Sequence, residues 1–80
     1  MKLEYKPQAV RQFKKLPKTE VKKIIRKLES LASDPHAGKI LKGELEGLKS
    51  LRAWPYRIIY GVKDTSVVIY SIAHRQGAYK

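Results

Sequence analysis

The sequence contains no cysteine, only two histidines and few acidic residues, and these shortages exclude several kinds of site. Without cysteine the chain can form neither a disulfide nor a thiolate metal site. The two histidines, His36 and His74, stand far apart and no cluster of carboxylates accompanies them. We therefore expect no protein-held metal and no cofactor. At 80 residues, we expect one domain, 1–80, whose stability comes from its apolar core and from any bound partner.

Long apolar runs are also absent. No segment approaches the ~20 apolar residues that a membrane helix needs, and the start MKLEYKPQ lacks the apolar core of a signal peptide. We therefore expect a soluble, cytoplasmic protein that does not enter a membrane. What the sequence does have is positive charge, with 18 Lys and Arg against 7 Asp and Glu and a net charge of +11. This surplus predicts a polyanionic partner, and nucleic acid is favoured over an acidic membrane or an acidic protein.

The N-terminal half of the chain predicts one strand and two helices. The alternating segment LEY predicts a strand over Lys2–Lys6, and apolar residues at helical spacing predict a helix over Gln8–Leu16. A second helix, Lys18–Ser33, has the clearest pattern. Its apolar positions are Val21, Ile24, Ile25, Leu28, Leu31 and Ala32. Pro17 separates the two helices, which would form a hairpin with one apolar stripe on each helix.

The C-terminal half changes to a pattern typical of strands. Residues 36–47 contain three glycines and predict a loop, whereas SLRAW, YRIIYGV and SVVIYSIA are rich in strand-forming residues. The segment KDTS between the last two predicts a hairpin turn. The whole chain thus predicts an α+β fold of order β-α-α-β-β-β, an antiparallel sheet with the N-terminal helical hairpin packed on one face.

Two arginines on these strands are candidates for anion binding. Strand alternation places Arg57 opposite the apolar face of YRIIYGV. In the last strand it predicts one face made of Val67, Ile69, Ser71, Ala73 and Arg75, and another made of Val68, Tyr70, Ile72 and His74. If odd positions pair with odd, Arg57 and Arg75 lie close together on the uncovered face, whereas a one-residue slip separates them. Two converging guanidinium groups suit a phosphate, the alternative being ordinary solvated arginines.

Other residues near these strands have several possible roles. Tyr79 would either stack on a base or pack on the sheet edge. His74 is the nearby group able to transfer a proton near neutral pH, although a lone histidine is more often structural. Trp54 would stack on a base or, as we favour, cap the core. A basic patch suited to a nucleic-acid backbone comprises Lys39, Lys42, Lys49 and Arg52. Because RNA supplies its own nucleophile, the 2′-hydroxyl, RNA is the better substrate if the protein is a nuclease.

The joint pattern LKGELEGLKSLRAWPYRIIYGV … HRQGAYK, in a basic chain of this predicted order, resembles the RelE/ParE superfamily of bacterial and archaeal toxins, and its RelE branch in particular. The resemblance implies the toxin of a type II toxin-antitoxin system, an endoribonuclease that cuts mRNA in the ribosomal A site and leaves a 2′,3′-cyclic phosphate. Its implied partners are the ribosome, mRNA and an acidic, RelB-like antitoxin in a hetero-oligomer.

By position, the resemblance also assigns roles to residues. Arg57 and Arg75 match arginines that contact the scissile phosphate, Tyr79 matches a tyrosine that stacks on or orients the substrate, and Arg52 matches a basic residue on the preceding strand. The general acid and base stay open. So does a second function on the same fold, a ParE-like inhibitor that binds DNA gyrase and has no nuclease activity, because fold alone does not decide function.

Overall fold

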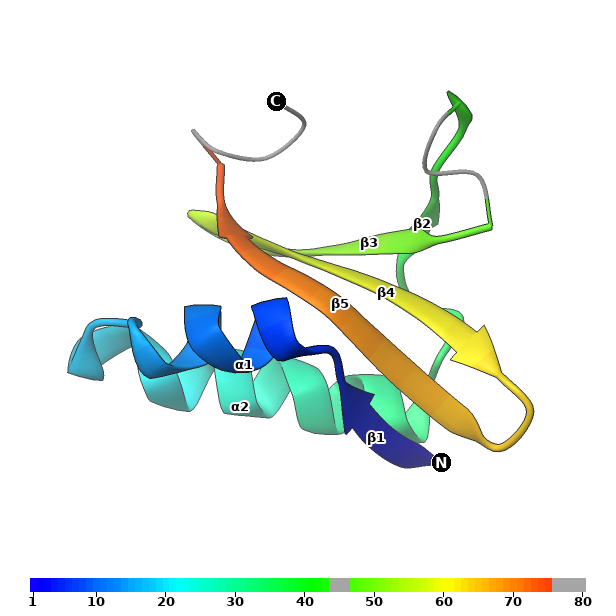
Figure 1. Cartoon of the computed structure of the whole chain (residues 1–80), viewed down its shortest axis with the longest axis horizontal. Coiled ribbons are helices and arrows are strands. Elements are labelled where there is room, and N and C mark those ends of the chain that lie inside the picture. Colours follow the sequence, from blue (N-terminus) through cyan, green and yellow to red (C-terminus); the bar gives the residue numbers. More distant parts are fainter. Residues whose placement is uncertain (44–46, 76–80) are drawn as a thin grey trace.

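The computed structural model describes residues 1–43 and 47–75, which form two helices and a five-stranded sheet (Figure 1). In chain order the elements are β1 (Lys2–Tyr5), α1 (Pro7–Lys14), α2 (Lys18–Ser33), β2 (Lys39–Ile40), β3 (Lys49–Ala53), β4 (Tyr56–Lys63) and β5 (Ser66–His74). Helix α2 has the predicted bounds. Helix α1 begins one residue before its predicted start, because the fixed φ of Pro7 suits the first helical position. Within the described ranges, neither helix is long and apolar enough to cross a membrane.

The sheet has the strand order β1-β5-β4-β3-β2. The α+β class and the helical hairpin on one face are confirmed, but the prediction of a wholly antiparallel sheet is wrong because β1 runs parallel to β5. The helical hairpin carries the chain across the sheet after β1, and this is the long connection that a parallel arrangement requires. The predicted loop over 36–47 also contains the short strand β2, which pairs with β3.

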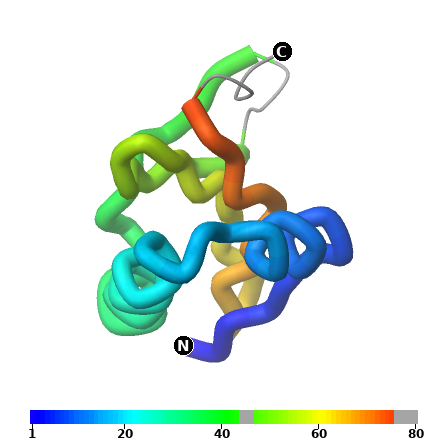
Figure 2. Tube along the Cα trace, turned by 90° about the vertical axis from the view of Figure 1, so that its left-hand side faces the viewer, coloured from blue at the N-terminus to red at the C-terminus, as the bar shows by residue number. Residues whose placement is uncertain are grey.

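The core lies between the helices and one face of the sheet. Figure 2 shows the two helices next to one another on the same side of the strands. The helices contribute Ala9, Ile24, Leu28 and Leu31, and the sheet contributes Ala53, Ile58, Tyr60, Val67, Ile69 and Ile72. Burial of these apolar side chains is the main source of the stability of a domain without disulfides.

Tyr60 is the largest fully buried side chain, and its hydroxyl group joins the sheet to the segment that follows α2. The hydroxyl donates a hydrogen bond to the carbonyl oxygen of Pro35 (3.0 Å) and accepts one from the backbone N–H of Gly38 (2.8 Å). A Cβ atom at Gly38 would lie 2.6 Å from the same hydroxyl oxygen, so only glycine fits. Burial raises the pKa of Tyr60, which further favours the protonated form that donates to Pro35.

A β-bulge in β5 changes which of its residues share a face. Ile59 pairs with Ser71, but the next residue, Tyr60, pairs with Ile69, so Tyr70 is an extra residue without a cross-strand partner in β4. The predicted strict alternation along the last strand is therefore wrong. The physical reason is that the core residues of this strand, Val67, Ile69 and Ile72, are spaced unevenly, and the bulge lets all three face the helices.

Candidate nucleic-acid interface

The face of the sheet that the helices leave uncovered carries a row of arginines. Arg52 of β3 pairs directly with Arg57 of β4, and Arg57 pairs with Ala73 of β5. Their neighbours Ala53 and Ile58 point into the core, so the arginine side chains point away from the helices. Arg52 is exposed and Arg57 is half-buried. Like charges directly opposite one another on adjacent strands repel, so this row favours an anion bound on the face.

The direct pairing of Arg52 with Arg57 was not predicted, although the sequence contains a signal for it. The connection between β3 and β4 consists of Trp54 and Pro55, joined by a cis peptide bond, and Ala53 pairs with Tyr56 across it. The length of a hairpin loop sets the register of its strands. A two-residue loop at this place therefore puts the two arginines opposite each other.

Arg75 follows β5 and lies on the same side of the sheet as Arg57. Its backbone N–H donates a hydrogen bond to the carbonyl oxygen of Pro55 (2.7 Å), which continues the β4–β5 pairing by one residue. Because Arg57 pairs with Ala73, odd positions pair with odd at this end of the sheet, as the prediction required. The guanidinium carbon of Arg75 lies 4.8 Å from the centre of the Trp54 ring. Trp54 is 57% exposed, so the prediction that it caps the core is wrong.

His74 and Tyr79 were predicted to act with these arginines. His74 pairs with Tyr56 across the strands, and their rings meet edge to face with centroids 5.4 Å apart. Alternation therefore places the His74 side chain on the opposite face from Arg57 and Ala73, at the end of the sheet. Tyr79 lies outside the described residues.

The predicted basic patch divides between the two faces of the sheet. Lys39 pairs with Ser50, which pairs with Ile59, so Lys39 shares the face of Arg52 and Arg57. Lys49 instead pairs with Tyr60 on the helix side, where its Nζ atom lies 2.8 Å from Nδ1 of His36.

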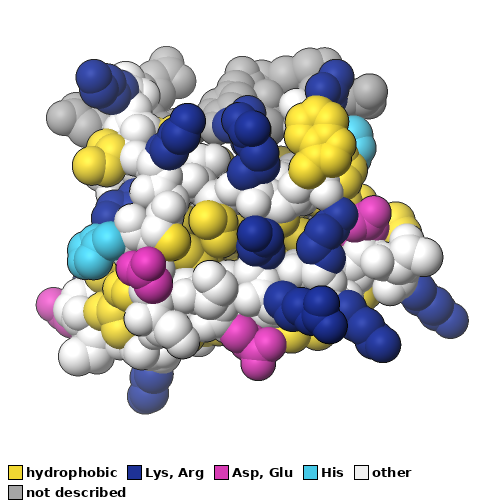
Figure 3. Space-filling model, turned by 180° about the vertical axis from the view of Figure 1, so that it is seen from behind, with side chains coloured by type: hydrophobic (Ala, Val, Ile, Leu, Met, Phe, Trp, Pro, Cys, Tyr) yellow, Lys and Arg dark blue, Asp and Glu magenta, His cyan; other side chains and the backbone are white. Residues whose placement is uncertain are grey.

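Lys42 is exposed after β2. Figure 3, seen from behind, shows Lys and Arg side chains spread from the helix layer to the upper edge of the sheet, with fewer acidic ones among them. Among residues 1–43 and 47–75, no three His, Cys, Asp or Glu side chains gather closely enough to hold a metal ion.

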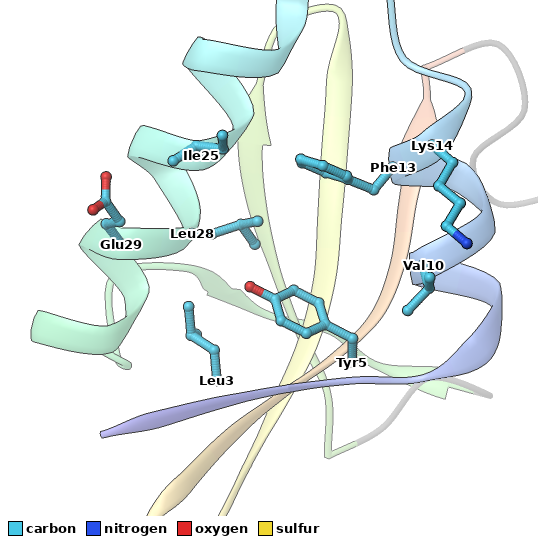
Figure 4. Close-up of a pocket in the computed structure, with 8 residues that line it drawn as sticks. All are labelled: Leu3, Tyr5, Val10, Phe13, Lys14, Ile25, Leu28 and Glu29. Carbon is cyan, nitrogen blue, oxygen red and sulfur yellow. The ribbon is translucent and has the colours of Figure 1, made fainter.

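A second feature, on the helix side, is an apolar pocket of about 330 Å³ between β1, α1 and α2 (Figure 4). Its apolar lining consists of Leu3, Tyr5, Val10, Phe13, Ile25 and Leu28, and the charged side chains of Lys14 and Glu29 complete it. Tyr5, Val10 and Ile25 are exposed although they are large and apolar, so the pocket opens to solvent. It lies on the other side of the sheet from the arginine row.

Comparison with known proteins gives consistent relatives. Residues 3–79 match the family described as ParE toxin of type II toxin-antitoxin system, parDE. The chain is 42% identical over 53 residues to Toxin RelE of Mycobacterium tuberculosis, a match that spans 62% of this chain and 55% of that relative.

Solved structures resemble the fold over most of the chain. The toxin-antitoxin complex RelBE2 of Mycobacterium tuberculosis is similar with a TM-score of 0.84 and 32% identity, covering 92% of this chain and 96% of that one. The YoeB-YefM complex of Staphylococcus aureus gives a TM-score of 0.76 at 29% identity, covering 92% and 95%. The intact RelBE complex of E. coli gives a TM-score of 0.76 at 26% identity, covering 91% and 94%.

Proposed function

This chain belongs to the RelE/ParE superfamily, the toxins of type II toxin-antitoxin systems, and we propose that within it the chain is a ribosome-dependent endoribonuclease. Acting in the cytoplasm, it cuts mRNA in the ribosomal A site and so inhibits translation. The observation that carries this proposal is the arginine row on the uncovered face of the sheet, in which Arg52 opposes Arg57 and Arg75 follows on the same side. A protein that acts only by binding gyrase has no chemical need for such a row.

The proposed reaction uses the nucleophile that RNA carries. The 2′-oxygen attacks the adjacent phosphorus, the bond from phosphorus to the 5′-oxygen of the next nucleotide breaks, and the products are a 2′,3′-cyclic phosphate and a free 5′-hydroxyl. The 2′-hydroxyl gives up one proton to a base and the leaving oxygen takes one from an acid. Negative charge grows on the phosphate oxygens as the phosphorus becomes five-coordinate.

The guanidinium groups of Arg57 and Arg75 suit this change in charge. Each offers a planar set of N–H donors that binds two phosphate oxygens together and keeps its positive charge when partly removed from water. Donors positioned in advance for a developing anion lower the barrier by several kcal/mol. Tyr79 would stack on or orient a base, while Lys39, Lys42 and Arg52 would bind the RNA backbone; Lys49, on the helix side of the sheet, is not part of this surface. His74, the proton-transfer candidate from the sequence, lies on the opposite face of the sheet from Arg57, so we assign it no role in this step.

The partner of this toxin is an antitoxin, as in the solved complexes that share its fold. We propose that it is acidic and RelB-like and forms a hetero-oligomer with this chain. Two features support an acidic, amphipathic segment: the net charge of +11, and the apolar pocket between β1, α1 and α2. An amphipathic helix places apolar side chains in such a groove while its acidic face meets the surrounding lysines.

The proposal is tested by cleavage of mRNA on purified ribosomes, with the ends of the products identified. We expect a cut in the A site, a 2′,3′-cyclic phosphate, and no cut when the nucleotide before the cut carries a 2′-deoxy sugar. Cleavage should persist in a chelator at a concentration that leaves the ribosomes intact, since we propose no metal in the reaction. Equal cutting of the deoxy substrate would contradict the mechanism.

Because the matching family is that of ParE toxins, we retain one alternative function, which is inhibition of DNA gyrase by binding. Expression of the protein in cells separates the two functions. Induction of the nuclease should stop translation with truncated mRNA, whereas a gyrase inhibitor should first raise DNA damage signalling while mRNA stays whole. Intact mRNA together with early DNA damage signalling would replace our proposal with this second function.

A further inference from the structure

The two-residue turn between β3 and β4 is held by three contacts from other parts of the chain. The ammonium group of Lys23, on α2, donates a hydrogen bond to the carbonyl oxygen of Trp54. The backbone N–H of Arg75 donates one to the carbonyl oxygen of Pro55. The guanidinium group of Arg75 also lies over the Trp54 ring, 4.8 Å from its centre. The turn therefore links the helix layer to the residue that ends the described part of the chain.

These contacts matter because Arg75 would otherwise have a freely moving side chain. It is exposed and lies beyond the last residue of β5, where the sheet gives little support to a long, flexible arginine. A cation lying over the face of a tryptophan ring is attracted by the negative potential of that face, and tryptophan is the best of the aromatic residues for this contact. The ring thus favours one orientation of the guanidinium group.

The backbone of Trp54 is held from both sides of the turn. The ammonium group of Lys23, which donates to the carbonyl oxygen of Trp54, also forms an ion pair with Glu20 on the same helix. It is therefore held from two sides. On the other side of the turn, Ala53 is buried and pairs with Tyr56. The backbone of the turn is therefore fixed, while the ring itself is more than half exposed and free to meet the guanidinium.

From this geometry we infer that Trp54 is a positioning residue for Arg75: its ring holds the guanidinium group on the side of the sheet that carries Arg57. The inference rests on the proposed function, because it assigns the positioned group to the phosphate site of the nuclease. Trp54 itself does not touch the reacting atoms in this account. It acts through Arg75, so its effect must disappear when Arg75 is absent.

The contact can be measured without any activity, because Trp54 is the only tryptophan of the chain. Its fluorescence, excited selectively over tyrosine, reports on the ring that faces the guanidinium. We expect Arg75→Ala to increase quenching by acrylamide, since one face of the ring loses its cover. Arg11→Ala on α1, a matched loss of one exposed arginine, should leave quenching unchanged. Equal quenching in wild type and Arg75→Ala would show that the contact does not form and would overturn the inference.

The consequence for activity is tested by a double-mutant cycle in single-turnover cleavage on purified ribosomes. Trp54→Ala should slow cleavage about tenfold, the rate equivalent of one cation–π contact, and Trp54→Phe should retain most of the rate. In an Arg75→Ala background, Trp54→Ala should cause no further loss. If the two losses instead multiply, Trp54 acts independently, for instance by stacking on a base, and the inference is wrong.

Two controls separate the possible failures. Because the Trp54 side chain is largely exposed, the melting temperature of Trp54→Ala should stay within a few degrees of wild type, and a collapse in melting temperature with the same loss in Trp54→Phe would contradict positioning. If wild type does not cleave mRNA at all, the proposed nuclease fails, and the quenching comparison still decides whether Trp54 holds Arg75.

Discussion

Removal of the Arg75 guanidinium group is the sharpest test of the proposed site. Arg75 lies on the side of the sheet that carries the opposed pair of Arg52 and Arg57, and its orientation is set by the Trp54 ring. If it stabilises charge that appears only in the transition state, Arg75→Ala should cost on the order of 3 kcal/mol, or about a hundredfold in rate. Arg57→Ala should behave similarly.

The comparison variant is Arg26→Ala, which removes an exposed arginine from α2 and leaves the net charge equal to that of Arg75→Ala. A general loss of positive charge would slow both variants to the same extent. The assay is single-turnover cleavage of A-site mRNA with ribosomes in excess, so that the rate of the chemical step is measured apart from turnover. Arg75→Lys, which keeps the charge but loses the planar fork, should fall between wild type and Arg75→Ala. If Arg75→Ala cuts as fast as Arg26→Ala, the assignment of Arg75 to the phosphate is refuted.

Three further predictions concern binding and stability. Ribosome binding should weaken steeply as salt concentration rises. Lys39→Ala should reduce the slope of log binding constant against log salt concentration by roughly 0.7 to 0.9, whereas Lys49→Ala, on the helix side, should change this slope little. Equal slopes for the two variants would contradict the assignment of these lysines to different faces. Tyr60→Phe should lower the free energy of unfolding by about 1–3 kcal/mol in urea titrations, since it leaves two backbone groups unpaired. The antitoxin should raise the melting temperature of the toxin, and Ile25→Glu in the pocket should reduce that rise while Ile40→Glu, 72% exposed at the far edge strand, should not.

The helices were predictable because each follows from local pattern. The apolar stripe over Lys18–Ser33 and the proline before it determine where α2 begins and which face it buries. The direction of β1 was not predictable in the same way. Its four residues carry no sign of which strand they will join, and the parallel pairing with β5 depends on how the helical hairpin crosses the sheet. The direction of β1 and the strand with which it pairs are determined by the packing of the whole domain.

The faces of β5 show a different limit. A period of two predicts faces only while the strand is regular, and the extra residue Tyr70 shifts every position before it to the opposite parity. The pairing of Arg57 and Arg75 is unaffected, because Arg57 comes before the bulge along β4 and Arg75 comes after it along β5, at the end of the sheet where odd positions still pair with odd. The predicted meeting of the arginines therefore holds in register, although the predicted faces of Val67 and Ile69 relative to Ile72 do not.

The contact between Trp54 and Arg75 could not be predicted from the sequence pattern, because it depends on strand pairing that continues past the end of β5. The opposition of Arg52 and Arg57 is different, since the two-residue loop implies it, and it also bears on function. In a domain with net charge +11, two like charges placed directly across a strand pair work against folding. A small fold without disulfides has little stability to lose, and an anion bound on that face, as we propose, would offset this repulsion.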